Sequence, residues 1–396
     1  GKLTTEKNFL LLPPDCACGP NCSSGQLGGQ VWEDYNQDGI KSSVEKNGVA
    51  GVSVTAYDCN GVAYGPVTTS ACGYYTFGAT IASNKYPVRL EFSNIPSDYQ
   101  NSTTFNGTNS RTSVQKISAA TCNANLGVAD PREYCQNNPR IAVPQYINGD
   151  PLPTTIGTSP CIGTAQNPAS NAPTLVSFPS NQTGTFPNPS TTTFALASQT
   201  GGVWGMAYQK KSKSLFSSAV VKRHVGLGTL GLGGIYITNT ATNVTTNFLK
   251  VSDLGINVGN DANFKNNTNR SLPEERTCPN ADKAGFDNVG KLGIGDLDIS
   301  DDGSRLFFVN LLDRKVYAIN IDPVNPSAAT SSLYGSWAVP NTCGNAGDNR
   351  PWGLTYHQGK VYVGTVCSQE STQSASGLKA TVFEINENAP GSTPTQ

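Results

Sequence analysis

The chain has 396 residues, only 14% of them charged, and its formal net charge is −1. That length predicts two or three domains with room for sizeable cores. The low charge excludes the basic stripe expected of a protein that binds nucleic acid or an anionic membrane, and no apolar run reaches the roughly eighteen residues that a membrane span needs.

The first segment, residues 1–26, is expected to be an N-terminal arm. It combines a short apolar patch, Asn8–Leu12, with two prolines and a cluster of cysteines. No basic and then apolar leader precedes Gly1, so we expect the chain to begin after processing or to be an internal piece of a longer protein. Abundant turn-forming residues and a single Met are typical of β-rich extracellular proteins.

The segment from Asp34 to Glu45 fits the twelve-residue calcium pattern D-x-[DN]-x-[DN]-G-x5-E at every defined position. Calcium takes six to eight oxygen ligands. The expected ligands are the side chains of Asp34, Asn36 and Asp38, the backbone carbonyl of Ile40, Ser42 or a water, and both carboxylate oxygens of Glu45. The alternative is a polar Asn/Asp turn that fits the pattern by chance. The sequence favours a calcium site.

The residues on either side of this loop alternate and are rich in β-branched side chains, as in Gly28–Trp32 and Val49–Tyr57. They predict strands, whereas an EF-hand sensor would have helices there. We therefore expect calcium to play a structural role.

Four stretches of residues 27–130 resemble one known family. They are Gly29–Ile40, Gly51–Asp58, Gly73–Phe77 and Tyr86–Phe92, and they are similar to the SdrD B-like (Cna B-type) repeat of bacterial surface proteins. The resemblance implies a seven-stranded, prealbumin-like β-sandwich that acts as a calcium-braced stalk without catalytic activity. Some relatives form a Lys–Asn isopeptide bond, and we assign none here.

Residues 131–200 are rich in Pro and Asn and contain short apolar runs such as Ile141–Val143 and Thr174–Phe178. We expect a long, disulfide-pinned connection that contributes strands to the following domain.

Residues 201–396 contain a repeat of three strands, followed in two cases by a fourth strand, Phe248–Val251 or Leu333–Trp337. The three units are Trp204–Tyr208, Ser214–Val220 and Gly234–Thr238; Gly295–Ile299, Arg305–Val309 and Lys315–Ile319; and Trp352–Tyr356, Lys360–Gly364 and Thr381–Ile385. This order predicts blades of a β-propeller, with a plain antiparallel sandwich as the alternative. The segment resembles the NHL/YVTN-type propellers of large secreted bacterial proteins.

The predicted fold class is thus all-β, a prealbumin-like β-sandwich followed by a β-propeller. Three blades cannot close a ring, and the residues after Ile385 have the composition of a linker. We expect the propeller to be incomplete, with further strands supplied by chain beyond Gln396 or by a partner. The alternative is that residues 132–200 hold the missing strands and complete the ring.

Eleven cysteines without paired C-x-x-C motifs favour disulfides over zinc, and their odd number leaves at least one unpaired or bonded to another chain. The alternative at the first three is a soft-metal site. The disulfide candidates are Cys16, Cys18, Cys22, Cys59, Cys72, Cys122, Cys135, Cys161, Cys278, Cys343 and Cys367.

Catalytic patterns are weak in this sequence. The two histidines, His224 and His357, have no G-x-S-x-G motif to accompany them. Asp296 and Asp298, expected on an inner strand, could hold a metal as in a lactonase, but such residues more often bind backbone groups. The glycine-rich stretch 222–234 lacks the G-K-[ST] ending of a phosphate loop, and we expect a flexible partner-binding loop there.

The sequence therefore predicts a non-catalytic, extracellular protein of the bacterial cell surface that acts in adhesion, gliding or surface assembly. Its expected cofactor is calcium, and its expected partners are other surface proteins, glycans or further copies of itself. The alternatives are a propeller hydrolase or lactonase carried on the same stalk, and a subunit of a homopolymeric sheath or filament.

Overall fold

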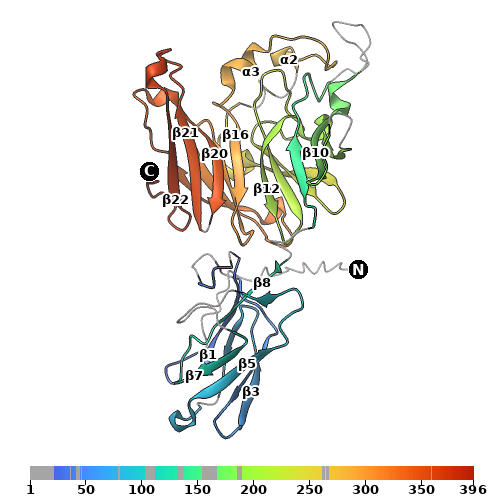
Figure 1. Cartoon of the computed structure of the whole chain (residues 1–396). Coiled ribbons are helices and arrows are strands. Elements are labelled where there is room, and N and C mark those ends of the chain that lie inside the picture. Colours follow the sequence, from blue (N-terminus) through green and yellow to red (C-terminus); the bar gives the residue numbers. More distant parts are fainter. Residues whose placement is uncertain are drawn as a thin grey trace, which may run out of the picture. The chain divides into compact units, whose positions relative to one another are not determined.

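The computed structural model describes residues 22–35, 37–41, 45, 47–78, 81–102, 112–131, 137–153, 167–184, 190–260, 264, 267–357 and 359–396. The chain divides into two compact units, Gly1–Gln136 (unit 1) and Asn137–Gln396 (unit 2). Both consist of β-sheets with few short helices, which confirms the all-β prediction (Figure 1). Several predicted features lie outside the described residues: most of the arm, Asn36, Ser42, Cys16, Cys18, Cys135 and Cys161.

The described part of unit 1 contains two four-stranded sheets. The first has the order β4-β1-β8-β6 and consists of β4 (Tyr74–Thr76), β1 (Gly28–Glu33), β8 (Leu126–Ala129) and β6 (Gln100–Asn101). The second has the order β3-β2-β5-β7 and consists of β3 (Ala63–Thr68), β2 (Ser53–Tyr57), β5 (Val88–Ser93) and β7 (Val114–Ile117). A short 3-10 helix, η1 (Ser83–Lys85), precedes β5.

The two sheets of unit 1 share one apolar core. Side chains alternate along β2 and β5, so every second residue is buried. The core contains Val54 and Leu90 from one sheet and Val31 and Leu126 from the other, all fully buried. Each such side chain contributes about 1.5–3 kcal/mol through its removal from water.

Gly73 holds the turn before β4 against β1. It has φ of +72°, and a Cβ there would lie 2.0 Å from the carbonyl oxygen of Val31, whose N–H donates to Gly73 O at 2.9 Å. We expect Gly73→Ala to destabilise unit 1 by more than the roughly 1–2 kcal/mol that a left-handed alanine costs, because backbone must also move. Gly61→Ala is the control, since Gly61 has φ of +78° and nothing within 4 Å. Calorimetry showing equal melting temperatures for the two variants would contradict this.

The described residues of unit 2 form four antiparallel sheets that follow one another along the chain. The first is β9 (Arg140–Pro144), β10 (Pro173–Pro179) and β11 (Thr192–Leu196). The second is β12 (Val203–Gln209), β13 (Ser214–Ala219), β14 (Gly234–Asn239) and β15 (Val244–Lys250). The third is β16 (Ile294–Ile299), β17 (Arg305–Asn310), β18 (Lys315–Asn320) and β19 (Ser332–Ala338). The fourth is β20 (Asn349–His357), β21 (Lys360–Cys367) and β22 (Lys379–Asn386).

Short helices connect these strands. They are α1 (Ala197–Thr200), α2 (Asn267–Arg270) and α3 (Lys283–Asn288), with 3-10 turns η3 (Ala169–Asn171), η4 (Val251–Leu254), η6 (Ala328–Thr330), η7 (Ala346–Asp348) and η8 (Ala375–Gly377). No helix in the described ranges is long and apolar enough to cross a membrane.

The predicted repeat is present in the second, third and fourth sheets. The first strand of each has a bulge at the same place, beginning at Val203, Ile294 and Pro351. These first strands lie side by side, with β16 between β12 and β20 (Figure 1). Residues 131–200, predicted as a connection that contributes strands, form a sheet of their own in their described part.

Apolar clusters join neighbouring sheets of unit 2 in chain order. Leu175 and Leu215 join the first and second sheets, as Ile235 and Phe308 join the second and third. A further cluster joins the third sheet to the fourth. Among the described residues no such cluster joins the fourth sheet to the first. The propeller therefore stays a prediction.

The last residues of the chain correct one expectation. The segment after Ile385 was predicted to be a linker, yet Thr395 pairs with Glu384 on the outer edge of β22 through two backbone hydrogen bonds of 2.7 and 2.9 Å. The indole of Trp337 also donates to the carbonyl oxygen of Ala389 at 2.7 Å. The composition of the segment hid this strand-like contact, because a single bridge at Thr395 leaves no alternating pattern in the sequence.

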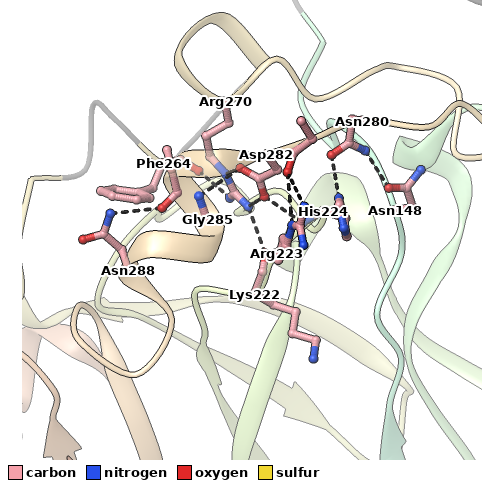
Figure 2. Close-up of polar contacts among 12 residues, drawn as sticks. Asn148, Lys222, Arg223, His224, Phe264, Arg270, Asn280, Asp282, Gly285 and Asn288 are labelled. Atoms are coloured by element: carbon pink, nitrogen blue, oxygen red, sulfur yellow. Dashed lines mark hydrogen bonds and ion pairs between the residues drawn. The ribbon is translucent and has the colours of Figure 1, made fainter. Parts of the chain in front are cut away.

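A buried ion pair holds the long segment between β15 and β16 (Figure 2). Arg270 Nη2 lies 2.5 Å from Asp282 Oδ2, and neither side chain is exposed. Asp282 also accepts from the backbone N–H groups of Gly285, at the start of α3, and of His224, before β14. Burial disfavours ionisation, but these hydrogen bonds and the Arg270 charge outweigh it, so the pKa of Asp282 lies below its usual range.

Candidate metal centre

The candidate calcium loop connects the two sheets of unit 1, since β1 belongs to one and β2 to the other. Its ends are fixed by backbone hydrogen bonds. Asp34 N–H donates to the carbonyl oxygen of Val128 in β8 at 2.8 Å, and Glu33 N–H donates to that of Asn47 at 3.0 Å. Gly48 then forms a bridge with Trp32 of β1. The loop therefore begins and ends on the same strand of the sheet.

The three acidic residues of the pattern lie together. Carboxylate oxygens of Asp34, Asp38 and Glu45 all lie within 4.8 Å of one another. Two oxygens bound to one calcium ion at about 2.4 Å can be at most about 5 Å apart, so the separation is compatible with a shared ion. Asp34 and Glu45 are buried, whereas Asp38 is exposed.

The surroundings of Asp34 provide a test of whether a cation fits. Its Oδ2 accepts from the backbone N–H of Gly39 at 2.9 Å and from the hydroxyl of Ser102. Its Oδ1 is buried without a hydrogen-bond partner. A buried carboxylate oxygen without a donor is costly, and a bound cation would satisfy it. The residues present fit calcium.

The turn inside the loop has the geometry that the pattern predicts. Gly39 has φ of +74° and Gln37 has φ of +55°. The backbone N–H of Ile40 donates to Asp38 Oδ1 at 2.7 Å, which holds that carboxylate in the turn. Ile40 itself is exposed. The left-handed backbone conformation at position 39 favours glycine, because glycine has no Cβ that would clash with the backbone.

Like charges oppose one another at this site, because the three carboxylates are close together. Lys41 is the neighbouring cation. Burial lowers the pKa of Lys41, although attraction to Glu45 acts in the opposite direction. A divalent cation would neutralise the acidic group more completely than this lysine.

Ser102 is a contributor that the sequence pattern does not contain. It lies 68 residues beyond Asp34 in the chain, just after β6, and its buried hydroxyl donates to Asp34 Oδ2. We expect Ser102→Ala to raise the calcium dissociation constant by about tenfold, because groups that orient a metal ligand contribute to metal affinity. Calorimetric titration with calcium measures this. Ser97→Ala, at an exposed position in the same unit, should leave the constant unchanged.

The described cysteines are mostly in disulfides. Cys22 bonds to Cys122, and Cys343 bonds to Cys367. Cys72 and Cys278 are also disulfide-bonded, and Cys59 is free and exposed. The alternative for the first three cysteines was a soft-metal site. Cys22 cannot contribute to such a site, because its sulfur is in a disulfide and is not a thiolate ligand.

The other chemical candidates are engaged in the packing of unit 2. Asp296 and Asp298 accept from the backbone N–H groups of Leu354 and Tyr356 in β20, at 3.4 and 2.7 Å. Burial raises the pKa of both carboxyl groups. His357 is the last residue of β20 and is exposed, far along the chain from the partly buried His224. Through their bonds to β20, Asp296 and Asp298 join the third sheet to the fourth.

The glycine-rich stretch 222–234 is packed, which corrects the expectation of a flexible loop. Gly226 N–H donates to the carbonyl oxygen of Gly149 at 3.1 Å, and Leu227 is fully buried. A Cβ at Gly228 would lie 2.3 Å from the carbonyl carbon of Thr200. The glycines here allow backbone segments to approach each other closely.

Comparison with known proteins finds a domain match within unit 1. Residues 25–135 match the SdrD B-like domain. Colossin-D of Dictyostelium discoideum is 27% identical over 251 residues, covering 62% of this chain and 24% of that protein. Colossin-B of the same organism is 24% identical over 353 residues, which cover 87% of this chain and 8% of that protein. Serine-aspartate repeat-containing protein F of Staphylococcus epidermidis is 47% identical over 73 residues, which cover 18% of this chain and 4% of that protein. The chain thus spans about a quarter or less of the length of these relatives.

The solved structures that are similar to this chain are distant. A luciferin-regenerating enzyme has a TM-score of 0.29 and 12% identity, covering 78% of this chain and 76% of that one. A putative TolB from Agrobacterium tumefaciens has a TM-score of 0.31 and 8% identity, and the match covers 88% of this chain and 89% of that one. At these scores neither likeness carries an argument about function.

Proposed function

We propose that the chain is a non-catalytic, extracellular surface or structural protein in which unit 1 is a calcium-braced stalk. The observation that carries this proposal is the acidic group at the SdrD B-like loop, with its buried and unpartnered Asp34 Oδ1. Similarity to serine-aspartate repeat proteins and to colossins supports a structural role.

The calcium ion would be held by the residues of the loop pattern. Asp34, Asp38 and Glu45 would supply carboxylate oxygens, and Asn36 and the carbonyl of Ile40 would complete the set expected from the sequence. When bound, the ion would supply positive charge to a buried acidic group. Because both ends of the loop are held on β1, its immobilisation would fix the first part of the connection from β1 to β2.

The detailed fold of each unit is part of the same proposal. Unit 1 would be a prealbumin-like sandwich, supported by its two sheets around one core. Unit 2 would be a propeller-like array, supported by its four sheets in chain order and their recurrent bulge. Its surfaces would bind other surface proteins, glycans or further copies of the chain in adhesion, gliding or surface assembly.

The cell surface is the proposed location, and the source of the chain decides whether that surface is bacterial, since similar proteins occur in Staphylococcus and in Dictyostelium. The test is protease treatment of intact cells that produce the protein. The proposal expects its degradation without cell lysis, while a cytoplasmic control protein stays intact. Protection of the chain until the cells are lysed would overturn it.

A further inference from the structure

Two tryptophans of unit 2 meet near the beginning of the strands that carry them. Trp204 of β12 and Trp352 of β20 have ring centroids 6.2 Å apart and 71° between the ring planes, an edge-to-face contact. β16 lies between the two strands (Figure 1). Both tryptophans occupy the first position of the recurrent bulge, where β16 has Gly295. Because glycine has no side chain, the two indoles can meet across β16.

The tryptophan pair is open to solvent. Trp204 is 42% exposed, and Trp352 is partly buried against the apolar cluster that joins the third and fourth sheets. The other two tryptophans of the chain, Trp32 and Trp337, are fully buried. An exposed indole gains free energy when a ligand covers it, and tryptophan is enriched at the centres of binding surfaces. The pair is therefore a candidate binding surface.

A network of ion pairs borders Trp352. Gly290 lies beside the indole, since a Cβ there would be 3.9 Å from Trp352 Cζ3. The next residue, Lys291, places Nζ 2.5 Å from Glu370 Oε1. Arg350, two residues before Trp352 on β20, places Nη2 3.2 Å from Glu370 Oε2. Hydrogen bonds from Lys291 and Arg350 hold the pKa of Glu370 below its usual range, so this half-exposed carboxylate is ionised at neutral pH.

An indole beside a charged network suits a sugar ring. The C–H groups of a pyranose form an apolar face, which the negative face of an indole attracts. The hydroxyl groups around its rim both donate and accept hydrogen bonds. Glu370 can accept such bonds, and the guanidinium of Arg350 can donate them. Ligand sites in general combine aromatic surface with a few polar groups that fix orientation.

An organic cation is the competing ligand, because the faces of indole rings also attract ammonium groups. Its charge would need a carboxylate to balance it. Two described carboxylates close to the pair are already engaged. Glu370 contacts two cations, and Asp296, the residue after Gly295, accepts from two backbone N–H groups. The arrangement favours an uncharged ligand that is rich in hydroxyl groups.

We propose that Trp204, Trp352 and the network around Glu370 form a saccharide-binding site. A pyranose ring stacks on the exposed indole of Trp204, and its hydroxyl groups bind Glu370 and Arg350. The inference rests on the proposed function and deepens it, because it gives the glycan-binding role a site and a ligand class. The site lies wholly in unit 2.

The test is titration of the purified full chain with neutral hexasaccharides of glucose, mannose and N-acetylglucosamine. Because Trp32 and Trp337 are buried, quenching of tryptophan fluorescence by acrylamide reports mainly on the exposed pair. We expect at least one of these saccharides to reduce the quenching saturably, with a dissociation constant of about 1 mM or lower. A chelator should leave this constant unchanged, since the site is outside unit 1.

Substitution of Trp204 tests whether the saccharide stacks there. Trp204→Ala should raise the dissociation constant about tenfold or more, and Trp204→Phe, which keeps an aromatic face, should restore part of the affinity. Tyr146→Ala is the control. Tyr146 is 37% exposed, but Lys222 Nζ already lies 5.1 Å from its ring centroid, so the constant should not change. Calorimetric titration measures these variants, because it does not depend on the indole signal.

The polar part of the site has its own test. Glu370→Gln should raise the dissociation constant about threefold, because it weakens a charged hydrogen-bond acceptor and loosens Arg350. Glu384→Gln is the matched control. Glu384 also pairs with a lysine, Lys360, but on β22, and should leave the constant unchanged.

Three results would overturn the proposal. The first is the absence of any saturable effect of these saccharides up to about 10 mM. The second is binding that Trp204→Ala does not weaken, and the third is protection of the tryptophans by tetramethylammonium but by no saccharide. Circular dichroism of each variant checks folding. The titrations use purified protein, whereas protease treatment of intact cells tests the surface location, so the two proposals can fail separately.

Discussion

Removal of calcium with a chelator is expected to lower the melting temperature of unit 1 by about 10–20 °C and to leave that of unit 2 unchanged. A ligand at about a hundred times its dissociation constant stabilises the native state by about 2.7 kcal/mol. Each kcal/mol shifts the melting temperature of a domain of this size by about 4–8 °C. Scanning calorimetry with calcium and with chelator measures the difference.

The Asp34→Asn variant tests whether the loop is the source of that effect. The amide keeps the shape of the side chain but removes the charge of the buried oxygen that has no donor. Its melting temperature should no longer respond to the chelator. Glu91→Gln, at a partly exposed residue paired with Arg89, should respond as the wild type does. If the wild-type chain melts at the same temperature with calcium and with chelator, the metal centre is refuted.

Asp282→Ala is expected to destabilise unit 2 by about 3–5 kcal/mol, because it leaves the fully buried Arg270 guanidinium without its counter-charge. For a unit of this size that corresponds to a fall in melting temperature of about 10 °C. The matched control is Asp287→Ala. Asp287 pairs with Lys283 at the surface, where ion pairs contribute little to stability. The Asp287→Ala substitution should therefore leave the melting temperature almost unchanged. Equal effects of the two substitutions would contradict the assignment.

The same ion pair predicts how the stability of unit 2 depends on pH. The pKa of Asp282 is lowered in the folded protein, whereas in the unfolded chain it lies near the ordinary value of about 3.9. The stabilisation is therefore fully present above about pH 4 and is lost as the pH falls through the lower folded pKa. Melting temperatures of the wild type should fall more steeply in this acidic range than those of Asp282→Ala. Parallel curves would show that Asp282 is not responsible.

The sequence predicted that the acidic residues of the candidate calcium loop lie together and that a strand order repeats, because both depend on local patterns. Asp34, Asp38 and Glu45 are fixed by a spacing that a single loop can satisfy, and the structure brings their oxygens together. The strands of the second to fourth sheets follow from alternation of apolar residues, which needs no knowledge of the partner strand.

Features that depend on contacts distant in sequence could not be predicted. Ser102 reaches Asp34 across 68 residues, and no motif connects them. The Arg270–Asp282 pair is buried in the long segment between β15 and β16, for which the sequence predicted no strand or helix. The apolar runs Ile141–Val143 and Thr174–Phe178 were predicted to contribute strands, and they lie in β9 and β10. That these strands form a separate sheet with β11 depends on pairing between segments distant in sequence, which no local pattern contains.

The disulfide between Cys22 and Cys122 determines how unit 1 would respond to tension. Cys22 lies before β1, and Cys122 lies shortly before β8, the last strand of the unit. A pulling force applied between the N-terminal arm and unit 2 would pass from Cys22 through the sulfur bridge to Cys122, and would bypass the residues between them. Nearly 100 residues, about 330 Å of extended chain, would thus be excluded from stretching. Under load unit 1 would behave as an inextensible link, and a reducing agent would turn it into an extensible one.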